Sequence, residues 1–345
     1  MPISLAQHCD RLVDSSACRA DVVQVVHALA GAAKHIASLI SLGSLGEALG
    51  ESVGQNSDGD VQKYVDLRSH EIVMSVLKSA GVVAVASEES EELVLLNSEG
   101  SLAVAVDPLD GSSNIDANIS IGTIFSIIPV GRENRYGLGP FGGPGTQQLG
   151  AGFFIYGPQT ALVLTLGNGV DIFTLDPRTS DFRLTRANVR VKDGVREYAI
   201  NASNYRHWEV PVRIYIDDCL DGADGVRGSN FNMRWIASLV AETFRILARG
   251  GVFLYPADGR KGYENGRLRL LYEAAPIAFV MEQAGGMAST GRARILDLEA
   301  TSLHQRVPLI FGSADKVTRL NRLHESPDLD ARPSPLFAER GLFRT

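Results

Sequence analysis

The stretch "VDPLDGSSNID", from Val106 to Asp116, places a short polar motif between two apolar runs. The runs "SLAVA" before it and "ISIGTIFSII" behind it are typical of strands. Pro, Asp, Gly and Ser are ordinary turn residues, so the motif predicts a turn at the mouth of a strand. A plain connection does not require Asp107 and Asp110, whose side chains, three residues apart around a turn, could reach one point. The motif therefore indicates a candidate cation site.

The composition is that of a globular protein. The chain has 345 residues, of which 45% are hydrophobic and 21% charged. A net charge of −7 and a pI of about 5.6 argue against nucleic acid or an anionic membrane as the main partner. No stretch approaches the roughly 20 apolar residues of a membrane span. The N-terminus lacks a secretion signal, and three cysteines without paired spacing are typical of a reducing compartment, so we expect a cytoplasmic protein.

Helical and strand patterns predict an α/β (or α+β) protein of layered helices and sheets. Helices are predicted over 20–40, 64–81, 210–220, 234–251 and 276–286. Strands are predicted over 82–86, 102–106, 122–130, 150–157, 160–166, 171–175, 181–185, 198–201, 251–256 and 307–312. A change of texture near Gly194 suggests an N-terminal lobe with the metal site (1–194), a C-terminal lobe for substrate phosphate (195–330) and a loose tail (331–345).

Acidic residues in four segments are candidates for metal binding and acid–base chemistry. They are Asp60 and Asp66, Glu88 and Glu89, Asp107 and Asp110, and Glu273. Each has an ordinary alternative, such as a helix cap at Asp66, a solvated turn at Glu88 or a helix start at Glu273. However, Glu88 and Asp107 each follow a strand-type run, and neighbouring strands would bring these ends together. Converging carboxylates repel one another, and a hard cation such as Mg²⁺ or Mn²⁺ removes that penalty.

Basic residues in the second half suggest a phosphate-binding region. Arg234, Lys261, Arg267 and Arg269 occur in the segments that also contain Tyr255 and Asn201. Guanidinium groups bind phosphate in a bidentate manner, although these residues could also be solvated surface cations. Together with a metal cluster, they indicate a substrate with phosphate at one end that reacts at the other. The "GLGPFG" segment is not a nucleotide-binding turn, because Pro140 interrupts it and no helix follows.

The chain resembles the class I fructose-1,6-bisphosphatases, of bacterial type, within the lithium-sensitive phosphatase superfamily. The resemblance runs from about Asp21 to Leu320 and is carried by "DPLDGSSNID", "SEE", "GGVFLYP", "GRLRLLYE" and "EQAGGMASTG". It implies a layered α/β/α/β/α sandwich, commonly assembled as a homotetramer. It also implies magnesium-dependent hydrolysis of the 1-phosphate of fructose 1,6-bisphosphate, in gluconeogenesis or the Calvin cycle.

The resemblance also implies a role for individual residues. Metal ligands would be Glu88, Asp107, Asp110, Glu273 and the Leu109 carbonyl. Asp66 with Glu89 would activate the attacking water, and Asp60 would approach the metals when its loop closes. Contacts at the 1-phosphate would come from Asp110, Gly111, Ser112 and Ser113. Contacts at the 6-phosphate would come from Asn201, Tyr205, Tyr255 and Arg267, with Arg234 reaching in from a neighbouring subunit.

The chain departs from this family pattern at the 6-phosphate end. Arg267 stands where the animal enzymes have lysine, Trp235 replaces a tyrosine, and two extra residues lengthen the loop before Gly266. These changes leave open a bifunctional enzyme that also hydrolyses sedoheptulose 1,7-bisphosphate. A non-catalytic sugar-phosphate sensor is the alternative from another class, and the intact acidic set argues against it.

The resemblance predicts a weak response to AMP, which inhibits the animal enzymes. The positions that correspond to their nucleotide site carry Ser101, Leu102 and Pro129, and, less directly, Val23. These residues lack the cationic groups that would bind the AMP phosphate. A relocated site that uses Lys34 or Arg19 is the alternative.

Overall fold

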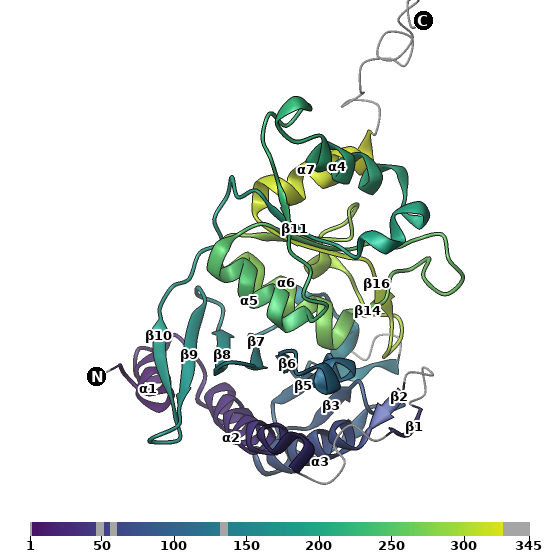
Figure 1. Cartoon of the computed structure of the whole chain (residues 1–345). Coiled ribbons are helices and arrows are strands. Elements are labelled where there is room, and N and C mark those ends of the chain that lie inside the picture. The colour runs from purple at the N-terminus through teal and green to yellow at the C-terminus, as the bar shows by residue number, and fades with distance from the viewer. Residues whose placement is uncertain (1, 46–51, 56–60, 132–136, 327–345) are drawn as a thin grey trace, which may run out of the picture.

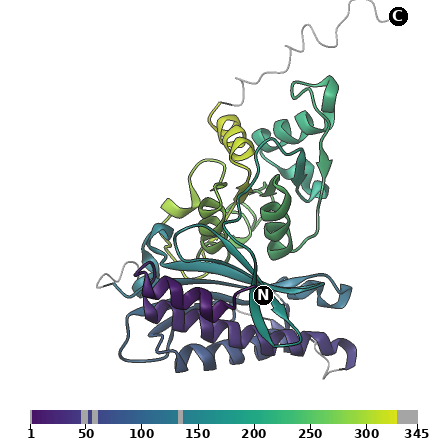
Figure 2. The same cartoon turned by 90° about the vertical axis from the view of Figure 1, so that its left-hand side faces the viewer.

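Helical and sheet layers alternate in the computed structural model of the chain, which describes residues 2–45, 52–55, 61–131 and 137–326 (Figure 1). Helices α1 to α3 cover one sheet, α5 and α6 lie between that sheet and a second one, and α4 and α7 cover the far side of the second sheet. The view turned by 90° shows the same order of layers (Figure 2). The predicted α/β/α/β/α sandwich is confirmed.

The first sheet has eight strands in the order β10-β9-β8-β7-β6-β5-β3-β4. Its strands are β3 (Ala84–Ser87), β4 (Val94–Leu95), β5 (Leu102–Asp110), β6 (Ile121–Pro129), β7 (Gly150–Tyr156), β8 (Thr160–Thr165), β9 (Asp171–Asp176) and β10 (Asp181–Arg186). Only the β3–β5 pair is parallel among the described pairs of this sheet, so the carboxyl ends of these two strands meet at one edge.

Both faces of this sheet are buried at its central strands, which explains why β5, β6 and β7 read as continuous apolar runs. In β5, Val104 and Val106 belong to the core under the outer helices, and Ala103 and Ala105 face the middle helices. The outer helices are α1 (Leu5–Asp14), α2 (Ala20–Leu42) and α3 (Tyr64–Ser79).

Helix α2 is long and apolar enough to cross a membrane by length and composition alone. This differs from the expectation that no stretch would approach such a span. Its buried residues, including Val25 and Ile36, belong to the same core as Phe125 and Phe154 of the sheet. We therefore interpret α2 as a core helix.

The second sheet has the order β12-β11-β13-β17-β15, and β11, β12 and β13 are parallel. Its strands are β11 (Glu197–Ala199), β12 (Asn232–Met233), β13 (Val252–Tyr255), β15 (Met287–Ser289) and β17 (Leu309–Gly312). The remaining helices are α4 (Val210–Asp221), α5 (Leu239–Arg249), α6 (Ala275–Gln283) and α7 (Ala314–Glu325). Two small antiparallel pairs complete the described strands: β1 (Ser52–Gln55) with β2 (Val61–Lys63), and β14 (Leu268–Arg269) with β16 (Arg306–Val307).

The "DPLD" segment is part of a strand, so the expected turn at Asp107–Asp110 is wrong. Strand β5 continues to Asp110, and its pairing with β6 shifts from Asp107–Ile124 to Asp110–Gly122. Three steps on β5 thus match two steps on β6, which is a β-bulge. Side chains alternate along a regular strand, so residues three apart would face opposite sides. The extra residue restores a common side, and the chain turns only at Gly111, which has a φ of 78°.

One helix cap and one helix start differ from the interpretations of the sequence. Asp66 is the third residue of α3 and not its N-cap, and its Oδ2 accepts a hydrogen bond from the Lys63 N–H at 2.8 Å. Helix α5 begins at Leu239 and not at Arg234, because Ser238 caps it by accepting from the Ala241 N–H at 3.3 Å. The N-terminus of α5 lies beside Asp110, whose Oδ2 accepts a hydrogen bond from the Val240 N–H at 3.3 Å.

Because Gly122 has no side chain, β6 can pack closely against Phe154 of β7 and Val240 of α5. Gly122→Ala should therefore destabilise the protein. An added Cβ would lie 2.2 Å from the Phe154 carbonyl oxygen and 2.8 Å from Cγ1 of Val240. Overpacking of this kind costs about 1–3 kcal/mol, and we expect a lower thermal midpoint together with lower activity. Gly31→Ala is the matched control, since nothing lies within 4 Å of its added Cβ. Equal thermal midpoints for the two variants would contradict this account.

Candidate active site

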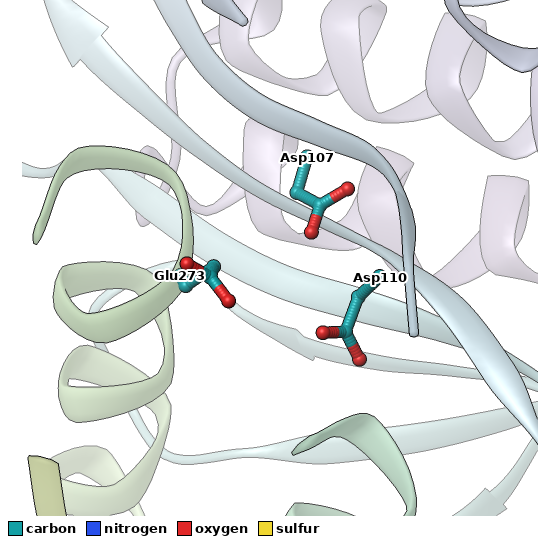
Figure 3. A group of neighbouring side chains, drawn as sticks. All are labelled: Asp107, Asp110 and Glu273. Carbon is teal, nitrogen blue, oxygen red and sulfur yellow. The ribbon is translucent and has the colours of Figure 1, made fainter. Parts of the chain in front are cut away.

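Three carboxylates meet at the bulge of β5. Asp107, Asp110 and Glu273 each offer an oxygen within 4.8 Å of the others, and all three are buried. Figure 3 shows the two aspartates on the strand and Glu273 on the facing helical segment, with their carboxyl groups directed into one space. Glu273 comes from a π-helical turn (Leu270–Ala274) that leads into α6, and such turns are frequent at functional sites.

Glu88 joins this group from the neighbouring strand, as the sequence predicted. It directly follows β3, and its N–H donates to the Val106 carbonyl at 3.2 Å, so it lies beside the end of β5. Its Oε1 is 3.4 Å from Nη1 of Arg269. Arg269 is itself buried and donates its backbone N–H to Glu273 Oε2 at 2.6 Å. Arg269 is therefore a cation of the acidic cluster, not the solvated surface residue that the sequence also allowed.

Burial and mutual repulsion raise the pKa values of the cluster. Burial, followed by the charge of Glu88, raises the pKa of Asp107 and that of Glu273, with Arg269 opposing the rise at Glu273. Burial likewise raises the pKa of Asp110 to about 7, against a hydrogen bond from the Val240 N–H at 3.3 Å. The group therefore resists being fully ionised unless positive charge is added.

Asp66 lies close enough to Glu88 to respond to its charge. Burial raises the pKa of Asp66 to about 6; the Lys63 N–H and the nearby Ser112 hydroxyl oppose this rise, and Glu88 adds to it. Its Oδ1 is buried, and no group among the described residues meets hydrogen-bond geometry with it. An oxygen in this state, next to a buried all-oxygen donor set, fits a site for a hard divalent cation and its water.

Leu109, Ser112 and Ser113 lie on the same segment as Asp107 and Asp110, and Glu89 lies next to Glu88. Leu109 is buried and donates its N–H to Asp107 Oδ1 at 2.9 Å, while Ser112 and Ser113 begin the short helix after Gly111. Glu89 is half-buried next to Glu88, and its N–H donates to Ser87 Oγ at 3.3 Å. Asp60 lies outside the described residues.

Sequence reasoning missed contacts that hold these segments in place. Ser87 Oγ is 3.1 Å from Nδ1 of His70 on α3, which ties the tip of β3 to that helix. Lys63 is buried, and its Nζ is 2.6 Å from Asp116 Oδ2, which ties β2 to the end of the motif. Sequence spacing could not predict these pairs, because each joins residues that are distant in the chain.

The predicted phosphate-binding residues lie at one edge of the second sheet. Asn201, Arg234 and Tyr255 stand at the carboxyl ends of β11, β12 and β13, and ligands commonly bind at this end of parallel strands. Asn201 Oδ1 accepts from Ser203, Arg234 Nε is 3.5 Å from Glu197 Oε1, and Tyr255 lies beside Trp235 with ring centroids 6.2 Å apart.

Tyr205 and Arg267 differ in how their polar groups are used. The Tyr205 hydroxyl donates to the Asp217 carboxylate on α4 at 2.8 Å. Arg267 lies over the ring of Tyr263, with its guanidinium carbon 4.8 Å from the ring centroid. Both assignments to the 6-phosphate stay predictions.

The position of Ser101, linked above to AMP, lies beside the Arg19–Asp21 ion pair. Its hydroxyl contacts the Asp21 carboxylate and accepts from Arg19 Nη2 at 2.7 Å. Hydrogen bonds from Arg19 and Ser101, which outweigh burial, lower the pKa of Asp21 and keep it ionised. The weak response to AMP stays a prediction.

Comparison with known families assigns both halves of the chain. The family model described as "Fructose-1-6-bisphosphatase, N-terminal domain" matches residues 8–187, and the corresponding C-terminal domain model matches residues 191–325.

Similar proteins match almost the whole chain. A class 1 fructose-1,6-bisphosphatase of Rhodopseudomonas palustris (strain BisB5) is 57% identical over 341 residues, which cover 97% of this chain and 98% of that protein. One from Nitrobacter hamburgensis is 54% identical over 343 residues, or 99% of each. The holo crystal structure of Leishmania major fructose-1,6-bisphosphatase superposes with a TM-score of 0.86 at 35% identity, covering 94% of this chain and 99% of that one.

The raised pKa of Asp110 predicts how the stability of the protein, measured in excess chelator, depends on pH. A carboxyl whose pKa is higher folded than unfolded stabilises the fold below about pH 4 and loses that contribution as pH rises through about 7. Asp110→Asn has no such loss, so its thermal midpoint should rise relative to the wild type between pH 5 and pH 8.

The variant must be compared with the wild type because three histidines, His27, His70 and His324, have pKa values lowered by burial. Their contribution to stability increases as pH rises, which is opposite to that of Asp110. Adding Mg²⁺ at pH 8 should reverse the order, because only the wild type keeps the full carboxylate set. A difference between the two midpoints that is independent of pH would refute this electrostatic account.

Proposed function

The chain belongs to the fructose-1,6-bisphosphatase family, and from this membership we infer that it is a phosphoric monoester hydrolase acting on fructose 1,6-bisphosphate. The reaction gives fructose 6-phosphate and inorganic phosphate, a step of carbohydrate metabolism and of gluconeogenesis. The observation that carries the mechanism is the buried group Asp107, Asp110 and Glu273. The finer assignments below, including attack at the 1-phosphate, are proposals.

Divalent metal ions, Mg²⁺ or Mn²⁺, would be held by the acidic cluster. The ligands would be the carboxylates of Glu88, Asp107, Asp110 and Glu273, with the Leu109 carbonyl. The close approach of Asp107, Asp110 and Glu273 and their raised pKa values support this role, because bound cations remove the repulsion. When bound, such metals neutralise phosphoryl oxygens, acidify water and stabilise a leaving alkoxide.

Asp66 is the proposed base for the attacking water, with Glu89 beside the metal ligands as its partner. Its pKa of about 6 lets it be ionised at neutral pH and still accept a proton during the reaction. The Lys63 N–H holds one carboxylate oxygen, so the other, Oδ1, is the one available to the water. Asp60 would approach this site from its own loop.

The 1-phosphate would lie at the turn that follows β5. Gly111 has a positive φ, and Ser112 and Ser113 begin a short helix immediately after it. Hydroxyls and backbone N–H groups of such a turn can donate to phosphate oxygens. Asp110 ends β5 at the same point and links this turn to the metal ligands.

The 6-phosphate would be bound at the edge of the second sheet. Asn201, Tyr205, Tyr255 and Arg267 are the proposed contacts. Arg234, whose side chain is 49% exposed, would reach a neighbouring subunit's site in a homotetramer. Binding energy from this remote phosphate can lower the barrier at the reacting end.

A panel of substrates tests the proposed function. With Mg²⁺, kcat/KM for fructose 1,6-bisphosphate should exceed that for inositol monophosphate by at least tenfold, because the monophosphate lacks the second anionic group. Phosphate release should vanish with excess chelator and return with Mg²⁺. Sedoheptulose 1,7-bisphosphate in the same panel decides whether the enzyme is bifunctional. Comparable constants for the bisphosphate and inositol monophosphate would favour a general monophosphatase instead.

Two variants separate metal binding from water activation. Asp110→Asn should lower kcat about 100-fold or more and abolish the rise in thermal midpoint that Mg²⁺ causes in the wild type. Asp66→Asn should lower kcat by a similar factor but keep that rise, because its proposed role is proton transfer. Near-normal kcat in Asp110→Asn, measured by phosphate release, would show that the metal assignment is wrong.

A further inference from the structure

The loop between β13 and β14 stacks two arginines on one tyrosine. In "ADGRKGYENGR", residues 257–267, the guanidinium carbons of Arg260 and Arg267 lie 4.2 Å and 4.8 Å from the ring centroid of Tyr263. Cations at such distances over a ring face are attracted by its quadrupole. Two positive charges on one ring also repel each other, so the charge of at least one should be compensated.

Arg260 is the compensated one. Its Nε lies 2.9 Å from Asp258 Oδ1, and its Nη2 lies 2.5 Å from Asp258 Oδ2, which is a bidentate ion pair. The Arg260 guanidinium in turn lowers the pKa of Asp258, which keeps the carboxylate ionised. The Arg260–Asp258 pair therefore places no net charge beside the Tyr263 ring.

Arg267 has no carboxylate within ion-pair distance and no side-chain hydrogen bond to any residue that the structure describes. It is half-buried, and the Tyr263 ring is the contact that fixes its guanidinium. A cation that is held in place, partly removed from water and not paired with a carboxylate can bind an anionic group. Arg267 is also two residues from Arg269, which contacts Glu88.

The loop that carries the ring is held rigidly. The Tyr263 carbonyl accepts from the Asp258 and Gly266 N–H groups at 3.1 Å and 3.0 Å, and the Tyr263 N–H donates to the Arg260 carbonyl at 3.0 Å. The Gly259 N–H donates to the His207 carbonyl at 3.0 Å, which ties the loop to the segment after Asn201. The backbone of Tyr263 is thus fixed by contacts that do not involve the side chains of the two arginines.

We propose that Tyr263 is a positioning residue that holds Arg267 in place for the phosphate remote from the reacting end of the substrate. The proposal rests on the proposed function, in which Arg267 contacts the 6-phosphate. The ring reduces the freedom of a long, flexible side chain before substrate arrives, so less entropy is lost when the phosphate binds. Tyr263 thereby contributes to selectivity for bisphosphates without touching the substrate.

Steady-state kinetics of Tyr263→Leu, with Tyr263→Phe as matched control, tests this proposal. Tyr263→Leu should raise KM for fructose 1,6-bisphosphate about three- to tenfold, lower kcat less than threefold, and weaken inhibition by fructose 6-phosphate by the same factor as KM. Tyr263→Phe keeps the ring and should stay within twofold of the wild type. The magnesium-induced rise in thermal midpoint should be the same in both variants, since the metal site is unchanged.

A double-mutant cycle with Arg267→Ala separates positioning from a general effect on the loop. Arg267→Ala alone should raise KM at least tenfold, and Tyr263→Leu should add nothing in that background. Effects that multiply, or a Phe variant as impaired as the Leu variant, would overturn the proposed role of Tyr263 and leave Arg267 as a phosphate contact. An unchanged KM in Arg267→Ala would overturn both assignments, while hydrolysis of the bisphosphate by the wild type would stand.

Discussion

Repulsion among buried carboxylates is the interaction around which this structure is organised. Asp107, Asp110 and Glu273 lie together where burial alone already disfavours their charge. The charge of Glu88 adds to the repulsion, and Arg269 offsets only part of it. Only a rigid frame keeps such groups together. Two paired strands, a bulge and a π-helical turn supply that frame, and close packing at Gly122 lets α5 approach it.

The layered arrangement, the longer strands and the meeting of Glu88 with Asp107 could be predicted from sequence. Short strands such as β4, β12 and β15 and the helices α1 and α7 were not predicted. Apolar runs mark strands buried on both faces, and acidic residues that follow the apolar runs of two neighbouring strands are expected to lie side by side. The bulge could not be predicted, because it depends on the register between β5 and β6 and not on the "DPLD" letters alone. The role of Arg269 was hidden for the same reason, since its partner Glu88 is far away in the chain.

The phosphate-binding end was less predictable because its residues come from strand ends and loops of the second sheet. Sequence and family resemblance suggested which side chains to consider, but only the structure tells how each is used. Arg234 lies near Glu197, the Tyr205 hydroxyl donates to Asp217, and Arg267 rests on an aromatic ring. Such differences between similar side chains arise from tertiary contacts, which a local pattern does not contain.

The middle layer of helices determines how the protein responds to cleavage and unfolding. Its core joins side chains of the first sheet, such as Phe153, to side chains of the second, such as Phe253 and Phe311, through α5 and α6. Neither half of the chain therefore encloses this core by itself. A cut near residue 190 would leave two fragments, each with an apolar sheet face exposed to water and prone to aggregate. Loss of either sheet should therefore expose this shared core and destabilise the other sheet.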